Sequence, residues 1–217
     1  MEKTNVIVLG VAVELGSREV EGLLGVRHGI DQERRVAFRG RLEHLRRLGC
    51  PVGVQTGKGK RAVFGWKQIT ELAFALDLID LGINPENAAR VIIEHELALL
   101  SAVKVLLTLH DVDVLTAVRD RKWPFRKTML IDVGVHALSG LKTDGTLSST
   151  TLGPVPGWKV ADWFLDQDAS ESRHVLVNLG ASIANLANFA SAWTGRDQSE
   201  VAAELVEWGD RLDVLHT

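Results

Sequence analysis

Residues 1–84 alternate short helical segments with glycine-rich turns, and these turns most limit what the first part of the chain can fold into. Ser17 can cap a first helix that ends at Gly25, and Asp31 can cap a second that runs to about Leu48. Gly49 follows at once and stops the second helix. Two short helices joined by a tight turn predict a helix-turn-helix near the start of the chain.

The second of these helices has an apolar side and a cationic side. At about 100° per residue, one stripe is apolar and consists of Phe38, Leu42, Leu45 and Leu48. Arg35, Arg39 and Arg46 gather on an adjacent side, with Arg47 next to Arg46. A helix held by its apolar side can offer arginines to the major groove of DNA, where they contact phosphates or pair with guanine. We therefore expect these four arginines to contact DNA.

Residues 52–64 (VGVQTGKGKRAVF) predict a β-hairpin with a cationic tip. Apolar, β-prone ends flank glycines that permit the turn, and Lys58, Lys60 and Arg61 lie at the tip. A hairpin of this kind after a helix-turn-helix is typical of a wing that contacts the DNA backbone. A nucleotide-phosphate loop is the weaker alternative, because the segment lacks the G-x-x-x-x-G-K-[ST] spacing.

The charge distribution also favours a polyanion partner. The 217 residues carry a net charge of -3, but residues 27–67 hold 11 basic residues against three acids, so they carry +8 and the rest -11. A basic block beside an acidic remainder is typical of nucleic-acid binding. The alternative is a solvated surface with a chance cluster of charges.

Residues 64–84 (FGWKQITELAFALDLIDLGIN) carry a more specific pattern. An aromatic residue is followed by a helix with apolar residues every three or four positions, then by Leu-Gly-Ile-Asn and by Pro85 at the start of a further helix. With the preceding helices and wing, residues 17–95 resemble the winged-helix DNA-binding domain of MerR-type transcription regulators. The resemblance implies that Lys58, Lys60 and Arg61 contact phosphates.

Two departures limit what the resemblance transfers. Glu43 stands where the family usually carries a recognition-helix arginine, and Arg46 where it usually carries a glutamate. The wing also has one residue more than is common between Arg61 and Phe64. The base contacts of the family are therefore not transferred to this chain.

Residues 86–110 read as one long helix whose apolar stripe is too wide for a single thin seam. In the resembling family such a helix pairs with its twofold mate, and a dimer would read two half-sites. A core helix packed within one chain is an equally weighted alternative.

The remaining residues predict a mixed region without a family resemblance. Residues 127–138 alternate as a half-buried strand, and residues 174–179 form a second strand. Two helices follow, over residues 181–193 and 199 to about 214. If the protein responds to an effector or partner, we expect that molecule to bind in this region.

Other candidate sites are weaker. A hydrolytic site could be built from Asp132, His136 and Ser139, but no G-x-S-x-G motif accompanies them. The histidines lack the spacing of zinc ligands. The aromatic side chains of Trp158, Trp163, Phe164 and Trp193 could line an effector pocket, although core packing is favoured.

Cys50, the single cysteine, follows two arginines that would lower its thiol pKa if they were close, although a buried inert thiol is favoured. We expect no catalytic residue, metal or cofactor.

The sequence thus predicts a mainly α protein with some β (α+β), not an enzyme. The expected ranges are a MerR-like winged helix-turn-helix (1–85), a connecting or dimerisation helix (86–112) and a C-terminal dimerisation or sensing region (113–217). One cysteine, no recognisable export signal and no apolar run of roughly 20 residues favour the cytoplasm.

The expected function is a sequence-specific transcription regulator that binds double-stranded DNA as a homodimer on an inverted repeat. An architectural or excision-type DNA-binding factor is the alternative, and an enzyme or ligand-binding protein without a DNA function is a third.

Overall fold

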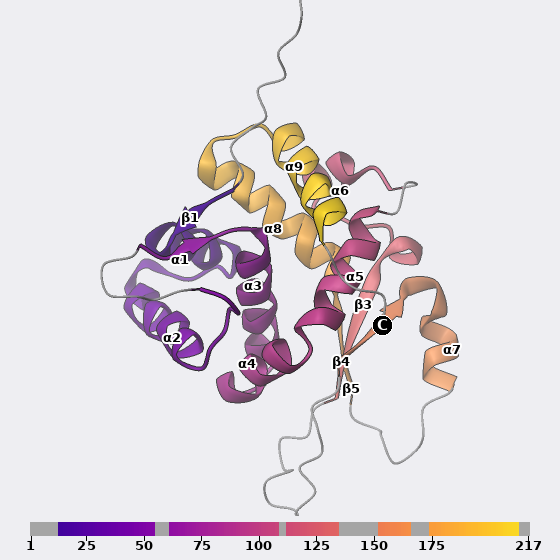
Figure 1. Ribbon diagram of the computed structural model, residues 1–217, viewed down its shortest axis with the longest axis horizontal. Coiled ribbons are helices and arrows are strands. Elements are labelled where there is room, and N and C mark those ends of the chain that lie inside the picture. The colour runs from indigo at the N-terminus through magenta and orange to yellow at the C-terminus, as the bar shows by residue number, and fades with distance from the viewer. Residues whose placement is uncertain (1–12, 55–60, 109–111, 135–151, 166–173, 213–217) are drawn as a thin grey trace, which may run out of the picture.

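The computed structural model describes residues 13–54, 61–108, 112–134, 152–165 and 174–212. The fold is mainly helical with two small antiparallel sheets, which confirms the α+β class (Figure 1). Helices α1 to α4 lie at one end of the molecule and the larger sheet with α7 at the other (Figure 1). No helix among the described residues is long and apolar enough to span a bilayer.

Besides α4, the first end of the molecule contains three α-helices, one 3₁₀ helix and a two-stranded sheet. Its elements are β1 (Leu15–Gly16), α1 (Ser17–Arg27), the 3₁₀ helix η1 (Gln32–Arg34), α2 (Arg35–Arg47), β2 (Val63–Phe64) and α3 (Trp66–Asp80). The first helix was expected to end at Gly25, but it continues to Arg27. At Gly25 the Arg35 side chain approaches closely, since a Cβ there would lie 2.1 Å from Nη1 of Arg35.

The expected hairpin over residues 52–64 is not what the described residues form. β2 pairs with β1, with Leu15 opposite Phe64, and residues 52 and 53 form a turn. The backbone N–H of Val52 is bound by the Glu71 carboxylate at 2.7 Å. Residues 55–60, which include most of the expected tip, lie outside the described residues.

The long helix expected over residues 86–110 is two helices, α4 (Pro85–Glu94) and α5 (Glu96–Thr108). His95 separates them with φ -118° and ψ 24°. Asn84 caps α4 by accepting the N–H of Asn87 at 2.8 Å. The apolar side chains of α5, such as Leu99 and Leu106, are buried, and α5 packs against α9 and the larger sheet of the same chain. Most of the wide stripe is therefore covered within one chain, although Leu97 and Val105 are 66% and 43% exposed and Leu109 lies outside the described residues.

The larger sheet has the order β4-β3-β5, with β3 in the centre. β3 is buried along its whole length rather than on one face, because α5 and α8 also pack on it. The elements of this part are α6 (Val114–Asp120), η2 (Phe125–Lys127), β3 (Met129–Gly134), β4 (Leu152–Pro156), η4 (Gly157–Lys159), α7 (Val160–Leu165), β5 (His174–Asn178), α8 (Leu179–Thr194) and α9 (Gln198–Arg211). The two expected strands and two final helices are confirmed within a few residues.

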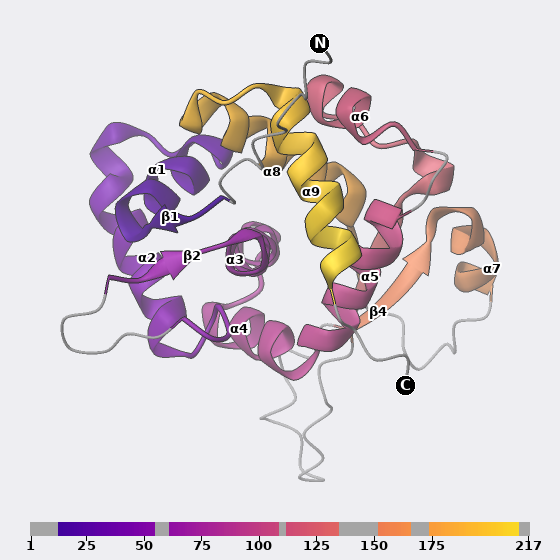
Figure 2. The same cartoon turned by 45° about the horizontal axis from the view of Figure 1, so that its top comes forward.

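One continuous core joins the two ends, since the buried apolar cluster runs from Val13 to Leu205. α9 lies between α3 and α5 (Figure 2), and the Trp66 and Trp208 rings stack there at 6.4 Å. The three ranges 1–85, 86–112 and 113–217 therefore share this core, although their separate roles stay predictions.

Candidate nucleic-acid interface

Helix α2 lies at the edge of the molecule (Figure 1), and it has one buried side and one exposed side. Phe38, Leu42 and Leu45 pack inward. On the outward side Val36 is 77% exposed, and no atom of the described residues lies within 4 Å of the position that a Cβ would take at Gly40. A helix held by one side and open on the other can dock against a partner without rearranging.

Arg35 lies at the boundary between these two sides and faces α1. Its Nη1 donates to the carbonyl oxygens of Glu21 and Gly22 at 3.4 and 3.5 Å. This half-buried arginine holds α2 against α1, so the structure does not present it as a groove reader.

Arg39 is exposed, and its guanidinium forms a two-point ion pair with Glu21. Nε and Nη2 of Arg39 lie 2.8 and 3.1 Å from the two carboxylate oxygens. This hydrogen bond to Glu21 raises the pKa of Arg39 above its ordinary value. A phosphate that reached Arg39 would have to replace the Glu21 carboxylate.

Arg46 is half-buried and packs over the Phe64 ring, with its guanidinium carbon 5.8 Å from the ring centroid. Its Nε is buried and has no hydrogen-bond partner among the described residues. The Phe64 contact directs the guanidinium towards the side of α2 that meets β2. Arg46 therefore retains unused hydrogen-bonding capacity close to the surface.

The other expected residues differ in how they are placed. Arg47 is exposed on the outward side of α2. Arg61 is exposed beside β2, with Nη2 3.4 Å from a Glu19 carboxylate oxygen. Lys58 and Lys60 lie outside the described residues.

A hollow of about 200 Å³ lies where α1, α2 and β2 meet, and we call it the α1–α2 hollow. It is lined by Ser17, Arg18, Val20, Glu21, Arg39, Leu42, Glu43, Arg46, Phe64 and Leu72. Three arginines from two helices thus converge on one concave surface.

Arg18 was not selected from the sequence, because it belongs to the first turn of α1 rather than to the arginine stripe of α2. The expected arginine cluster is therefore formed in part, with Arg39 and Arg46 in it, Arg35 turned to α1 and Arg18 added.

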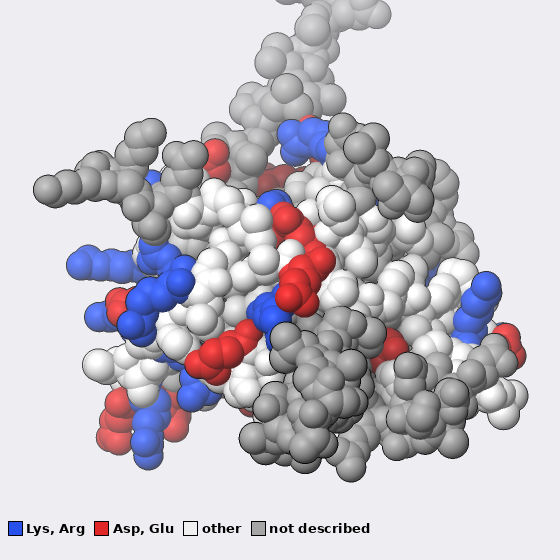
Figure 3. Space-filling view, turned by 60° about the horizontal axis from the view of Figure 1, so that its bottom comes forward, with Lys and Arg blue, Asp and Glu red and all other residues white. Residues whose placement is uncertain are grey.

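Acidic side chains moderate the charge of this surface. Glu21 and Glu43 line the hollow, and Glu19 lies beside Arg61. Lys and Arg side chains are nevertheless gathered at the left edge of Figure 3, while red side chains cross the middle of the same face. A polyanion would therefore be attracted to the α2 edge and repelled by the acidic side chains in the middle of this face.

Cys50 is fully buried behind α2. Burial, and then the charge of Glu71, raise the pKa of its thiol to about 12. The lowered pKa considered from the neighbouring arginines is therefore wrong, and the inert thiol is supported.

The remaining candidates are scattered. Nδ1 of His174 on β5 lies 2.9 Å from the Asp132 carboxylate on β3, whereas His136 and Ser139 lie outside the described residues. Trp158 and Phe164 are exposed, Trp193 is 44% exposed and packs against Gly22 of α1, and Trp163 is half-buried beside His174. None of the four belongs to the buried core, so the favoured interpretation of core packing is wrong. The described residues contain no cluster of three or more His, Cys, Asp or Glu side chains that could hold a metal ion.

Comparison with known proteins adds no relative to this picture. No protein-family model, curated protein or solved structure matches the chain.

Proposed function

We propose that this protein is a sequence-specific DNA-binding transcription regulator that contacts DNA through α2 and the adjoining α1–α2 hollow. The observation that carries the proposal is the convergence of Arg18, Arg39 and Arg46 on a hollow beside a helix whose outer side is free. The MerR-like sequence pattern of residues 17–95 supports the same assignment.

Each part of the surface has a distinct role in the proposal. Arg39 and Arg46 contact phosphates or guanine from the side of α2, and Arg61 contacts the backbone beside β2 together with Lys58 and Lys60. The exposed Val36 suits contact with a thymine methyl group. The missing side chain at Gly40 allows close approach of the helix to base edges.

The ion pair between Arg39 and Glu21 makes DNA binding an exchange of partners. Glu21 holds the guanidinium in place in the free protein, and a phosphate displaces the carboxylate in the complex. The regulator acts in the cytoplasm as a homodimer on an inverted repeat, because a single helix offers too little contact for tight binding.

The first experiment is selection of preferred duplexes from random DNA, followed by binding of the selected and a scrambled duplex at several salt concentrations. Arg39→Ala should weaken binding to the selected duplex by about 1 to 3 kcal/mol, and Glu21→Gln should strengthen binding because it removes the competing carboxylate. Arg211→Ala is the matched control, since Arg211 is also exposed and paired with a carboxylate of its own helix. It should change neither affinity.

The wing is tested by changing Lys58, Lys60 and Arg61 together to Ala. We expect weaker binding to every duplex and a salt slope lower by up to about three units. The proposal would be overturned if the protein bound no duplex, or if Arg39→Ala and the triple variant lost no more affinity than Arg211→Ala. Either result would favour a protein that binds a small ligand instead.

A further inference from the structure

A second hollow, of about 150 Å³, lies where the turn between α1 and α2 meets α2 and α3, and we call it the α2–α3 hollow. Its apolar lining consists of Ile30, Phe38, Leu76 and Ile79. Its polar lining consists of His28, Arg41 and Asp80. The volume is below the roughly 300 Å³ at which pockets for drug-sized ligands begin, so it suits a small metabolite.

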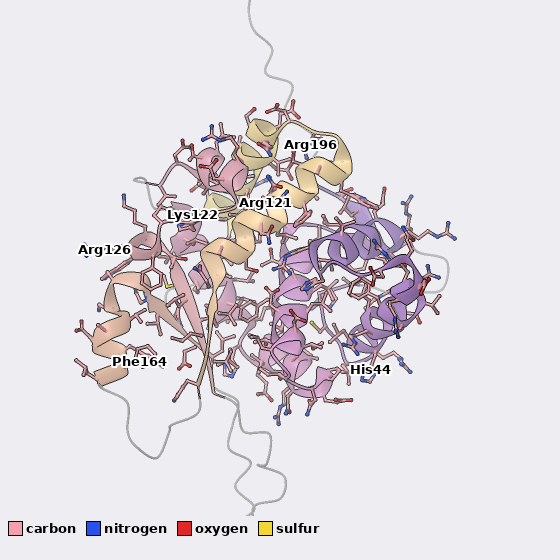
Figure 4. All side chains as sticks on the ribbon, turned by 180° about the vertical axis from the view of Figure 1, so that it is seen from behind. His44, Arg121, Lys122, Arg126, Phe164 and Arg196 are labelled. Atoms are coloured by element: carbon pink, nitrogen blue, oxygen red, sulfur yellow. The ribbon has the colours of Figure 1, made fainter. Side chains whose placement is uncertain are left out.

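The backbone holds both sides of the α2–α3 hollow in place. Gly29 has a φ of 62°, a left-handed conformation that commonly follows the end of a helix. The N–H of Ile30 then donates back to the carbonyl of Gly25 at 2.8 Å. On the other side Arg41 is exposed on α2, and His44, one turn further along, lies at the edge of the molecule (Figure 4). The hollow is therefore shaped by an ordered turn and is reached from solvent.

His28 brings a hydrogen-bond donor to the hollow. Its Nε2 lies 2.6 Å from Nη1 of Arg27, and because an arginine can only donate, Nε2 accepts and the ring proton is on Nδ1. Burial, and then the charge of Arg27, lower the pKa of His28 below its ordinary value, so the ring is largely neutral at pH 7. The Nδ1–H has no acceptor among the described residues, so a ligand oxygen in the hollow can accept it.

Arg41 and Asp80 bring opposite charges to the rim of the hollow. Both side chains are exposed, and neither forms an ion pair or hydrogen bond with another described residue. Asp80 is the last residue of α3, where the negative end of the helix dipole also attracts a cation. Its charge acts to raise the pKa of His28, so the carboxylate lies near the imidazole. The hollow thus offers one group for an anion and one for a cation above an apolar floor.

We propose that the α2–α3 hollow binds a free α-amino acid with an apolar side chain. Arg41 and the Nδ1–H of His28 bind the carboxylate of the ligand, and Asp80 binds its ammonium group. The apolar side chain of the ligand packs on Phe38 and Leu76. The inference goes beyond the proposed function, because this binding requires no DNA.

The polar groups of the hollow favour this ligand class over simpler ones. An inorganic anion would pair with Arg41 but would be repelled by Asp80, and a simple cation would meet the opposite problem. A wholly apolar ligand would remove both charges and the His28 donor from water without replacing their hydrogen bonds, which costs free energy. An apolar α-amino acid supplies a partner to all three groups and also covers the floor.

The first test is calorimetric titration of the full-length protein, without DNA, with L-leucine, L-isoleucine, L-methionine and L-phenylalanine. At least one of them should bind at a single site with a Kd of about 1 mM or lower. Glycine should bind about tenfold more weakly or worse, because it has no side chain to cover the apolar floor. The proposal is overturned if none of the four amino acids binds.

The second test removes the charges of the protein one at a time. Arg41→Gln and Asp80→Asn should each weaken binding of the best amino acid by about tenfold or more. Both side chains are exposed, so the variants should stay folded, which circular dichroism checks. Arg34→Gln and Asp31→Asn are the matched controls, because both residues are exposed after the same turn but lie outside the hollow. The controls should leave the affinity unchanged.

The third test removes the charges of the ligand, with ligand-detected NMR to measure the weaker complexes. The amide of the best amino acid lacks the carboxylate, so its affinity should fall with Asp80→Asn but not with Arg41→Gln. The N-acetyl derivative lacks the ammonium group, so its affinity should fall with Arg41→Gln but not with Asp80→Asn.

Equal losses for the amino acid and both derivatives, or losses no larger than those of Arg34→Gln and Asp31→Asn, would overturn the proposed site. No DNA is present in these titrations, so their outcome leaves the proposed function untouched. In the same way, failure to bind any duplex would overturn the proposed function and leave the amino-acid site standing.

Discussion

Glu71 is a fully buried carboxylate at the point where the chain leaves α2. One oxygen accepts the N–H of Val52, and the other has no hydrogen-bond partner among the described residues. Lys67 lies 3.7 Å away but also pairs with Glu96. Burial therefore dominates and raises the pKa of Glu71 to about 7. The folded chain holds this proton over a range in which the unfolded chain has lost it.

The sign of the pH dependence follows from this difference. Between pH 4.5, the ordinary value, and about 7, the folded state binds more protons than the unfolded state, so the free energy of unfolding falls as pH rises. Glutamine carries no charge at either pH, so Glu71→Gln should escape this fall. We expect the variant to be about as stable as the wild type at pH 5 and more stable than the wild type at pH 8, by up to about 3 kcal/mol. Urea denaturation at the two pH values measures the effect.

Glu200→Gln, at an exposed carboxylate, is the control for this measurement. A Glu71→Gln effect of the same size at both pH values would mean that the carboxylate is not protonated in the folded chain.

At the scale of elements, one side chain of α9 connects three parts of the fold. Oε1 of Glu204 accepts the N–H of Val13 at 2.5 Å and Nε1 of Trp66 at 2.8 Å, while Oε2 lies 2.6 Å from Arg196. The carboxylate is largely buried. It links α9 to α3 and to the segment that leads into β1, so it holds the α1–α3 end of the molecule against the C-terminal helices.

Removal of this link should destabilise the fold strongly. Glu204→Ala leaves buried donors and the Arg196 charge without a partner, which we expect to lower the free energy of unfolding by about 3 to 5 kcal/mol. Glu204→Gln keeps one acceptor and should cost less. Glu200→Ala, at the exposed carboxylate 3.7 Å from Arg196, should change stability by no more than about 0.5 kcal/mol. Equal effects of Glu204→Ala and Glu200→Ala would contradict this role.

At the scale of the whole molecule, helices α1 and α3 are joined to α8 by polar contacts and by close packing. Arg27 of α1 binds Asp77 of α3 through two contacts of 2.8 Å, and Ser182 of α8 bonds to both residues. Gly22 of α1 approaches α8 so closely that a Cβ would lie 2.2 Å from the Trp193 ring. We therefore expect the two ends to unfold as one cooperative unit.

We accordingly expect a fragment of residues 1–92 to lack a cooperative thermal transition and to bind a hydrophobic dye. The fragment loses α8 and α9, which exposes core side chains such as Leu23 and Trp66. A chain ending at residue 212 is the control and should unfold cooperatively. Calorimetry distinguishes the two results, and a sharp transition in the fragment would show that the first 92 residues form an independent domain.

Local signals in the sequence determined which segments are helices and where several of them begin. Asn84 and Pro85 start α4 because a cap and a fixed φ act within one turn. The apolar stripe of α2 also identified its buried side, since Phe38, Leu42 and Leu45 lie on one face of a helix with about 3.6 residues per turn. These features depend on neighbours three or four positions away, so they are readable without a structure.

Only the tertiary structure decided what each surface meets. The positions of Arg35 and Arg39 looked equivalent in the sequence. In the structure Arg35 donates to a backbone carbonyl of α1, whereas Arg39 stays exposed and pairs with the Glu21 carboxylate. The partner of β2 is β1, nearly 50 residues earlier. α7 is apolar yet uncovered. These outcomes depend on contacts between segments far apart in the chain, and a pattern of single residues carries no information about which segments meet.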